Sequence, residues 1–153
     1  MKFLELRVPP VVQFVVVGLA MWGLAEALPA FQISIPGAAW IAKGLCGVGL
    51  IVGLLAVVEF GKAGTTTDPR YPHKATSLVV GGIYRFSRNP IYLGLLLILT
   101  GGAFSLANGL SFLLLPVFVG YMNRFQIAPE ERHMQEKFGD EFLAYKARVR
   151  RWI

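Results

Sequence analysis

Charged residues and cysteine are both scarce in this chain. Only 16% of its 153 residues are charged, whereas 55% are hydrophobic, and the mean hydropathy is +0.57. Soluble domains carry about 25% charged residues, so this composition indicates a membrane protein in contact with the lipid bilayer. The one cysteine, Cys46, excludes an internal disulfide and a multi-cysteine metal site. The length predicts a single domain over residues 1–153.

Long uncharged blocks predict the membrane-spanning helices. The first two each have close to the roughly 20 residues that a helix needs to cross a bilayer. The third, 91–122, would form a helix of about 48 Å, which is too long for one comfortable span. Its middle holds the turn formers Ser105, Asn108, Gly109 and Ser111. The predicted fold is therefore an all-α, polytopic membrane bundle with four transmembrane helices, at about 9–28, 38–60, 91–106 and 110–125.

Lysine and arginine are absent from the loops near 29–37 and 105–111. All of these residues except Lys43 lie in segments that four spans place on one side: Lys2, Arg7, Lys62, Arg70, Lys74, Arg85, Arg88, Arg124, Arg132, Lys137, Lys146, Arg148, Arg150 and Arg151. The positive-inside rule makes that side the cytoplasm, with both termini there. Anionic lipid headgroups explain these residues more simply than nucleic acid does. Lys43 lies within the second span, where we expect it to pair with Glu26.

Glycines in the second span predict close helix packing. Gly49 and Gly53 form a Gly-x-x-x-Gly pattern, which lets two helix backbones approach each other. The pattern supports packing within the bundle at least as well as dimerisation.

The last 28 residues change in character. Pro129, followed by Glu130 and Glu131, predicts a helix start, Gly139 predicts its end, and Asp140 predicts the cap of a second helix. Apolar residues recur at three- or four-residue steps: Met134, Phe138, Phe142, Tyr145, Val149 and Trp152. We expect a cytoplasmic amphipathic helix pair that packs against the membrane or the bundle.

Familiar motifs of soluble enzymes are absent. The sequence has no Ser-His-Asp arrangement in a recognisable context, no Walker A loop, no GxGxxG and no His-rich spacing, so we expect no metal. Polar clusters at 84–94 and 123–132 instead flank the last predicted hairpin. The hairpin brings both clusters to one membrane surface. A positive-inside anchor with interfacial tyrosines explains each cluster alone, but it explains their pairing less well.

Two separated motifs carry a family resemblance. Residues 82–94 are Gly-Ile-Tyr-Arg-Phe-Ser-Arg-Asn-Pro-Ile-Tyr-Leu-Gly, and residues 130–145 are Glu-Glu-Arg-His-Met-Gln-Glu-Lys-Phe-Gly-Asp-Glu-Phe-Leu-Ala-Tyr. Their order and spacing resemble the isoprenylcysteine carboxyl methyltransferase and phospholipid methyltransferase superfamily of integral membrane enzymes. The resemblance covers about 61–153. It implies methyl transfer from S-adenosylmethionine, with S-adenosylhomocysteine as product, in a cytoplasmic cofactor region formed by 61–90 and 126–153.

The resemblance also implies the site residues. Those expected to bind the cofactor are Gly64, Thr65, Tyr84, Arg88, Asn89, Pro90, Tyr92, Gly94, Glu130 and Glu131. Those expected to act in catalysis are Arg85, Arg88, Glu130 and Glu131. An arginine could orient a carboxylate acceptor, whereas a glutamate could take a proton from an amine or thiol. Asn89 stands where the prenylcysteine enzymes commonly have histidine, and Arg150 where many members have proline, so a prenylated acceptor is one of several lipophilic candidates.

Two other classes remain as alternatives. Membrane reductases of the steroid 5α-reductase type share a C-terminal architecture but use NADPH, and their pattern does not centre on Arg-Asn-Pro-x-Tyr-x-Gly. A small scaffold or transport protein is the non-enzymatic alternative. Few charges within the spans and the lack of an internal repeat argue against transport.

Overall fold

A computed structural model describes residues 5–64 and 77–153 of the chain. The helices in this part are α1 (Pro10–Ala27), η2 (Pro29–Phe31), α2 (Ala38–Lys62), η4 (Gly82–Arg85), α3 (Pro90–Leu106), α4 (Gly109–Tyr121), η5 (Met122–Ile127) and α5 (Ala128–Arg148). No β-strand occurs among these residues, which confirms the all-α prediction. Thr65 and three of the basic residues, Lys2, Arg70 and Lys74, lie outside the described part.

Four apolar helices form the membrane bundle. Helices α1 and α2 are long and apolar enough to cross a bilayer, as is the continuous helix Gly109–Arg148, while α3 is a shorter apolar helix. The predicted spans 9–28, 38–60 and 91–106 agree with α1, α2 and α3 to within two residues. Large apolar side chains on α1 and α2 are exposed, including Leu19 and Leu54. This outward apolar surface suits contact with lipid.

Local sequence signals explain where the helices begin and end. Pro10 and Pro90 occupy the first positions of α1 and α3, where the missing N–H costs nothing. Ala107 ends α3 in the left-handed conformation, and the Asn108 side chain accepts a hydrogen bond from Leu110 N–H at the start of α4. The predicted hairpin turn is therefore confirmed.

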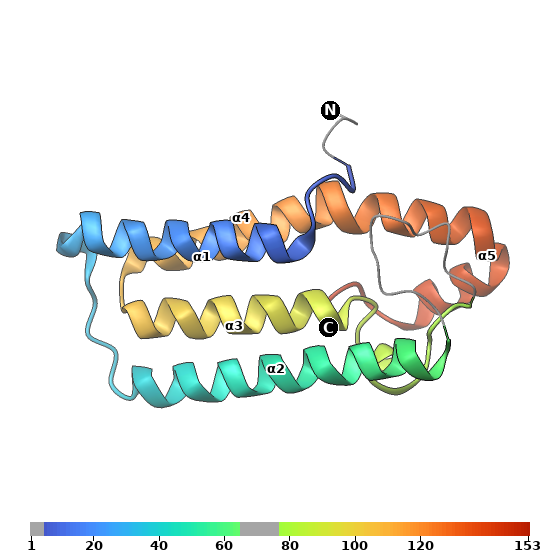
Figure 1. Cartoon of the computed structure of the whole chain (residues 1–153), viewed down its shortest axis with the longest axis horizontal. Helices are drawn as coiled ribbons and strands as arrows, with labels where there is room; N and C mark the ends of the chain where they lie inside the picture. The colour runs from blue at the N-terminus through green and yellow to red at the C-terminus, as the bar shows by residue number, and fades with distance from the viewer. Residues whose placement is uncertain (1–4, 65–76) are drawn as a thin grey trace.

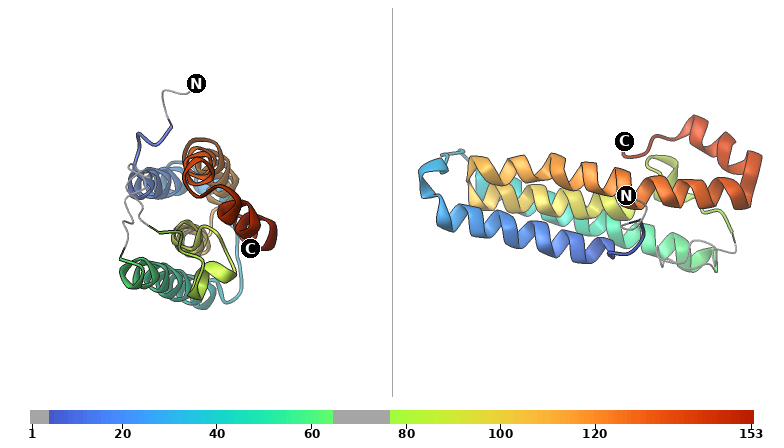
Figure 2. Two further views of the ribbon diagram at one scale, coloured as in Figure 1. Left: turned by 90° about the vertical axis from the view of Figure 1, so that its right-hand side faces the viewer. Right: turned by 90° about the horizontal axis from the view of Figure 1, so that it is seen from above.

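Helix α3 lies at the centre of the bundle and packs against α1, α2 and α4, as the view along the helices in Figure 2 shows. Its contact with α2 depends on glycine. A Cβ atom on Gly94 would lie 2.6 Å from the carbonyl oxygen of Gly49, and one on Gly49 would lie 2.7 Å from the carbonyl oxygen of Gly94. Any larger residue would force the two backbones apart. Gly49 of α2 thus serves packing within the bundle, whereas a Cβ atom on Gly53 would meet nothing within 4 Å.

Lys43 does not pair with Glu26. Its ammonium group lies 4.7 Å from the centre of the Trp40 ring, three residues earlier on α2. Neighbouring turns of one helix bring these two side chains together, whereas α1 and α2 are separated by α3 (Figure 2). A cation–π contact within α2 therefore replaces the expected ion pair.

Helix α5 extends the fourth helix beyond the bundle and then doubles back (Figure 1). The expected new start at Pro129 is not a break, because the chain stays helical from α4 through the π-helix η5 into α5. The bend is at Gly139, with φ 50° and ψ −124°, so the predicted pair of helices is confirmed as two limbs of α5. Phe142 and Tyr145 of the predicted apolar stripe are buried.

Candidate functional site

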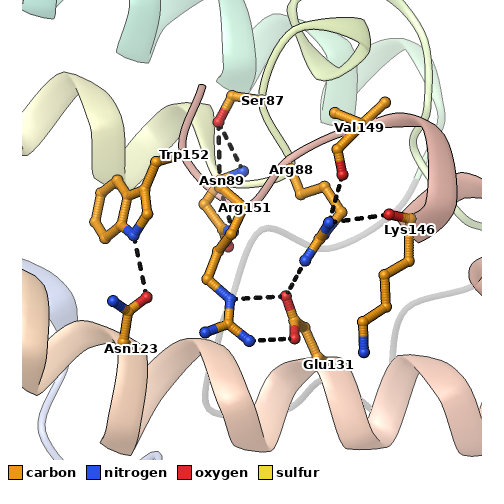
Figure 3. Close-up of polar contacts among 9 residues, drawn as sticks. All are labelled: Ser87, Arg88, Asn89, Asn123, Glu131, Lys146, Val149, Arg151 and Trp152. Atoms are coloured by element: carbon orange, nitrogen blue, oxygen red, sulfur yellow. Dashed lines mark hydrogen bonds and ion pairs between the residues drawn. The ribbon is translucent and has the colours of Figure 1, made fainter.

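Three segments meet around Glu131, near the start of α5. They are the turn at residues 87–89 before α3, helix α5, and the tail at residues 149–153. Figure 3 shows that side chains from all three point toward one another. This is the surface at which the two motif segments were expected to meet.

Glu131 joins the three segments through two arginines. Arg151 donates from Nε to one carboxylate oxygen at 3.1 Å and from a terminal nitrogen to the other at 2.6 Å. Arg88 donates to the first of these oxygens at 2.7 Å. This two-pronged geometry is the strong form of the arginine–carboxylate pair. Only 12% of the Glu131 side chain and 10% of the Arg88 side chain is exposed, so water screens the pair weakly.

Arg88 also binds the backbone that follows α5. Its guanidinium donates to the carbonyl of Lys146 at 3.3 Å and to the carbonyl of Val149. Its backbone N–H donates to the carbonyl of Arg150 at 3.0 Å. The Nε atom is buried and has no partner within the described residues. One donor of this arginine is thus unsatisfied by the described residues.

The neighbours of Arg88 hold the tail in place. Ser87 and Asn89 donate from their side chains to the carbonyl of Arg151, at 3.4 and 2.9 Å. The Trp152 indole donates to the Asn123 side chain at 3.0 Å. The turn before α3 and the start of η5 therefore both fix the tail, and the tail in turn carries Arg151 to Glu131.

Glu130 lies in a different environment from its neighbour. Its carboxylate accepts a hydrogen bond from the Tyr92 hydroxyl at 2.6 Å and another from the Gln126 amide. Glu130 lies six residues beyond Arg124, the first charge after the apolar part of the fourth helix, and so outside the predicted membrane span. Within the described residues, its hydrogen-bond partners are both neutral. A buried carboxylate is costly without a cation nearby.

The pKa values of the two glutamates diverge for this reason. Burial raises the pKa of Glu130 to about 7, with a smaller contribution from the negative charge of Glu131, although the bonds from Tyr92 and Gln126 oppose the shift. Burial also acts on Glu131, but the hydrogen bonds from Arg151 and Arg88 outweigh it and lower its pKa. The same pairing raises the pKa of Arg151. Neighbouring carboxyl groups are thus prepared for different roles.

Tyr84 packs beneath the second limb of α5. Its carbonyl accepts a hydrogen bond from the Tyr145 hydroxyl at 2.7 Å, and its ring meets Phe60 edge to face with 5.5 Å between centres. Burial is the main reason that the pKa values of both tyrosines are raised, that of Tyr145 to about 12. Both hydroxyls therefore stay protonated at neutral pH.

Comparison with known proteins identifies the family. The family model for phospholipid methyltransferases matches residues 38–141, which is more than half of the chain.

The chain belongs to the phospholipid methyltransferase family.

A protein of Haemophilus influenzae described as uncharacterized is 48% identical over 63 residues, which are 41% of this chain and all of that protein. No solved structure gives a significant match. The family assignment makes this chain a membrane methyltransferase and does not favour a reductase or a scaffold protein. The residues that the family model matches, 38–141, include the turn before α3, Glu130 and Glu131.

The structure brings together most of the residues that the methyltransferase motifs singled out. Arg88 contacts Glu131, and Tyr92 contacts Glu130. Asn89 holds the tail and Tyr84 receives Tyr145. All of these residues lie in or next to the turn before α3 or the first limb of α5.

Other predicted residues lie apart or serve the fold. Arg85 is exposed, and its side chain has no hydrogen bond or ion pair with the described residues. Pro90 opens α3, and Gly94 lies in the glycine contact with α2. Gly64 follows the end of α2 with φ +61°. Thr65 lies outside the described residues.

Sequence reasoning missed Arg151, Gln126 and Tyr145 as parts of the site. Each contacts a motif residue: Arg151 contacts Glu131, Gln126 contacts Glu130, and Tyr145 contacts Tyr84. One signal was present, because Gln126 and Glu130 are four residues apart on a helix and so share a face. The fold of the tail, which carries Arg151 to Glu131, had no local signal.

Proposed function

We propose that this methyltransferase transfers a methyl group from S-adenosylmethionine to a lipophilic acceptor at the cytoplasmic face of the membrane. The observation that carries the proposal is Glu130, a carboxylate whose hydrogen-bond partners among the described residues, Tyr92 and Gln126, are both neutral. A cationic ligand would complete this environment. S-adenosylmethionine carries two positive groups, the sulfonium and the amino group.

The other residues suit the rest of that cofactor. The free Nε of Arg88 is a donor for its carboxylate, and the aromatic ring of Tyr92 lies next to Glu130, where it could contact the sulfonium. When bound, the cofactor supplies an electrophilic methyl group. The work left to the protein is to hold the reactants in line and keep water away, which can provide much of the rate.

The distribution of charge supports a cytoplasmic site. The basic residues of α5 and the tail lie at the same end of the bundle as the turn that carries Arg85 and Arg88 (Figure 1). The positive-inside rule assigns such an end to the cytoplasm. An acceptor with an apolar tail could then reach the site from the bilayer while its polar group meets the cofactor.

The pairing pattern favours an acceptor that loses a proton. A carboxylate acceptor, as in an isoprenylcysteine, would need an unpaired cation within the site, whereas the arginines of the site, Arg88 and Arg151, are both paired with Glu131, and Arg85 is exposed outside it. An amine or thiol would need a base, and Glu130, with a pKa of about 7, is suited to that role. Asn89 is consistent with this preference, because the prenylcysteine enzymes commonly have histidine at this position. Here the Asn89 side chain instead donates a hydrogen bond to the tail.

Calorimetry on the detergent-purified protein tests the proposal. We expect S-adenosylhomocysteine to bind, NADPH not to bind, and the Arg88→Ala variant to bind S-adenosylhomocysteine at least about tenfold more weakly, as expected on losing a charge-assisted hydrogen bond. Binding of NADPH alone would overturn the proposal in favour of a reductase. Binding of neither compound would favour a scaffold protein. Wild-type affinity in Arg88→Ala would overturn the assignment of this residue to the site.

A further inference from the structure

Two consecutive residues before α1 reach across to the helix that carries the candidate site. The backbone N–H of Leu6 donates to the carbonyl of Phe125 at 3.0 Å. The carboxylate of Glu5 forms an ion pair with Arg132. Residues 5 and 6 lie outside the range 38–141 that the family model matches, so the family relationship does not account for these contacts.

The carbonyl of Phe125 has a particular need for this donor. In a regular α-helix it would accept from the N–H four residues later, but that residue is Pro129, which has no N–H. The helix widens to a π-helix over Met122–Ile127 at this point, and π-turns are frequent at functional sites. Leu6 therefore donates to a carbonyl whose partner position in a regular α-helix is occupied by a proline.

Leu6 adopts an uncommon backbone conformation to do so. Its φ is +57°, in the left-handed region, which is unfavourable for leucine. Such a conformation persists when the surrounding contacts fix it, and it is enriched near functional sites. Here the fixing contacts are the bond from Leu6 itself and the adjacent Glu5–Arg132 pair.

Phe125 and Arg132, the residues that Leu6 and Glu5 contact, lie on either side of Glu130 in the sequence. Gln126 follows Phe125 directly, and Arg132 follows Glu131 directly. The Gln126 amide contacts both the Glu130 carboxylate and, at 3.4 Å, the Tyr92 hydroxyl. A shift of the π-turn would move Gln126 away from these partners.

We propose that Glu5 and Leu6 are positioning residues for the cofactor site. They hold the π-turn so that Gln126 and Tyr92 direct the Glu130 carboxylate toward the bound cofactor. They do so through Phe125 and Arg132, without touching the cofactor. This inference rests on the proposed function, because it concerns the affinity of that same site.

A charge swap tests the ion pair. We expect Glu5→Arg and Arg132→Glu each to weaken S-adenosylhomocysteine binding about fivefold, and the double variant to return to within about twofold of the wild type, because the reversed pair restores the contact. Glu141→Arg is the matched control, since Glu141 is an exposed glutamate on the second limb of α5. Equal affinity in all variants would overturn the role of the pair.

A second pair of variants tests the backbone bond. Leu6→Pro removes the N–H and cannot adopt the positive φ, so we expect weaker binding. Leu6→Gly keeps the N–H and tolerates the positive φ, so we expect binding close to that of the wild type. Weak binding in Leu6→Gly with normal binding in Leu6→Pro would contradict the inference.

The pH profile separates positioning from mere stabilisation. Glu130 is faced by Tyr92 from α3, by Gln126 from η5, by Glu131 with its paired Arg88 and Arg151, and by Tyr84 from η4. Since the bonds from Tyr92 and Gln126 lower the pKa of Glu130, their loss in Glu5→Arg should move the pH midpoint of binding upward. A lower melting temperature with an unchanged midpoint would indicate a structural role only and overturn the inference.

Hydrogen exchange keeps this test independent of the cofactor. In the ligand-free protein we expect the amides of residues 126–132 to exchange faster in Glu5→Arg and to recover in the double variant. Unchanged exchange would overturn the positioning role. Failure of the wild type to bind S-adenosylhomocysteine would overturn the proposed function instead, and the exchange result would still decide whether the segment holds the π-turn.

Discussion

The two ends of the bundle are closed by different kinds of contact. At the end opposite α5, Ile33 N–H donates to the carbonyl of Ala107 at 2.8 Å, and the Asn108 side chain donates to the carbonyl of Leu28 at 3.0 Å. These contacts are neutral. At the end that carries α5, an ion pair network centred on Glu131 joins three segments. A second carboxylate there, Glu130, has only neutral hydrogen-bond partners in the described part of the chain.

We interpret this difference as that between a structural closure and the proposed binding surface. At the Asn108 end, neutral amide and carbonyl groups pair with one another, and no buried side-chain polar atom of the described residues there lacks a partner. At the α5 end, within residues 5–64 and 77–153, the Nε atom of Arg88 has no hydrogen-bond partner and the Glu130 carboxylate accepts hydrogen bonds only from neutral groups. Buried polar groups without a hydrogen-bond partner, and carboxyl groups with a strongly shifted pKa, are typical of ligand-binding sites.

The largest effect should follow from breaking the network at Glu131. Glu131→Gln leaves Arg88 and Arg151 without their carboxylate, and loss of charge-assisted hydrogen bonds from a partly buried ion pair costs about 2 kcal/mol. We expect lower stability on thermal unfolding and at least tenfold weaker S-adenosylhomocysteine binding. The control Glu136→Gln changes an exposed glutamate of the same helix and should alter neither. Unchanged binding in Glu131→Gln would remove the distinction between the two ends.

The opposite end should respond in stability alone. Asn108→Ala removes the cap of α4 and the donor to Leu28, which together are worth about 2 kcal/mol. Thermal unfolding should show this loss, while calorimetry should show unchanged affinity for S-adenosylhomocysteine. Asn108→Ser keeps a capping oxygen without a charge but loses the donor to Leu28, and we expect an intermediate effect. A fall in ligand affinity would mean that this end also contributes to the site.

The smallest effect should come from Arg85. This residue is exposed, unlike Arg88 three positions later. We expect Arg85→Ala to change S-adenosylhomocysteine affinity by less than about threefold, because water screens an exposed charge. Calorimetry on Arg85→Ala and Arg88→Ala side by side measures the contrast. A loss in Arg85→Ala equal to that in Arg88→Ala would extend the site to the exposed face of the turn.

The sequence was sufficient for the membrane bundle because its signals are local. Uncharged length, the turn residues around Asn108 and prolines at helix starts each act within a few residues, and the structure agrees with them. Pro129 was misleading, since its missing N–H normally ends a helix. The chain stays helical through a π-helix, and the donor to the Phe125 carbonyl is Leu6, far away in the sequence. Lys43 was misleading for a similar reason, because its partner depends on which helices are neighbours.

The candidate site was predictable only in part. The two motifs and the hairpin between them were enough to bring Arg88 close to Glu131 and Tyr92 close to Glu130. The different roles of the two glutamates were not predictable, because they arise from Arg151 in the tail and from Gln126 in the π-turn. The motif residue Gly94 was predicted to bind the cofactor, whereas its contact with α2 shows that helix packing explains why it is a glycine.

The pH dependence of S-adenosylhomocysteine binding tests the central claim most directly. Glu130 must be ionised to hold the cationic amino group, so affinity should rise about tenfold from pH 6 to pH 8, through its pKa of about 7. The stability of the unliganded protein should change in the opposite direction and fall as the pH rises. Because folding raises this pKa above 4.5, the stability contributed by Glu130 is present below about pH 4.5 and is lost as the pH rises through about 7.

The Glu130→Gln variant completes this measurement. Its amide cannot ionise, so we expect weaker binding at pH 8 and no rise in affinity between pH 6 and pH 8. Calorimetry at several pH values on both proteins gives the comparison. A pH-independent affinity in the wild type, or the same tenfold rise in Glu130→Gln, would contradict the claim that this carboxylate holds the cofactor.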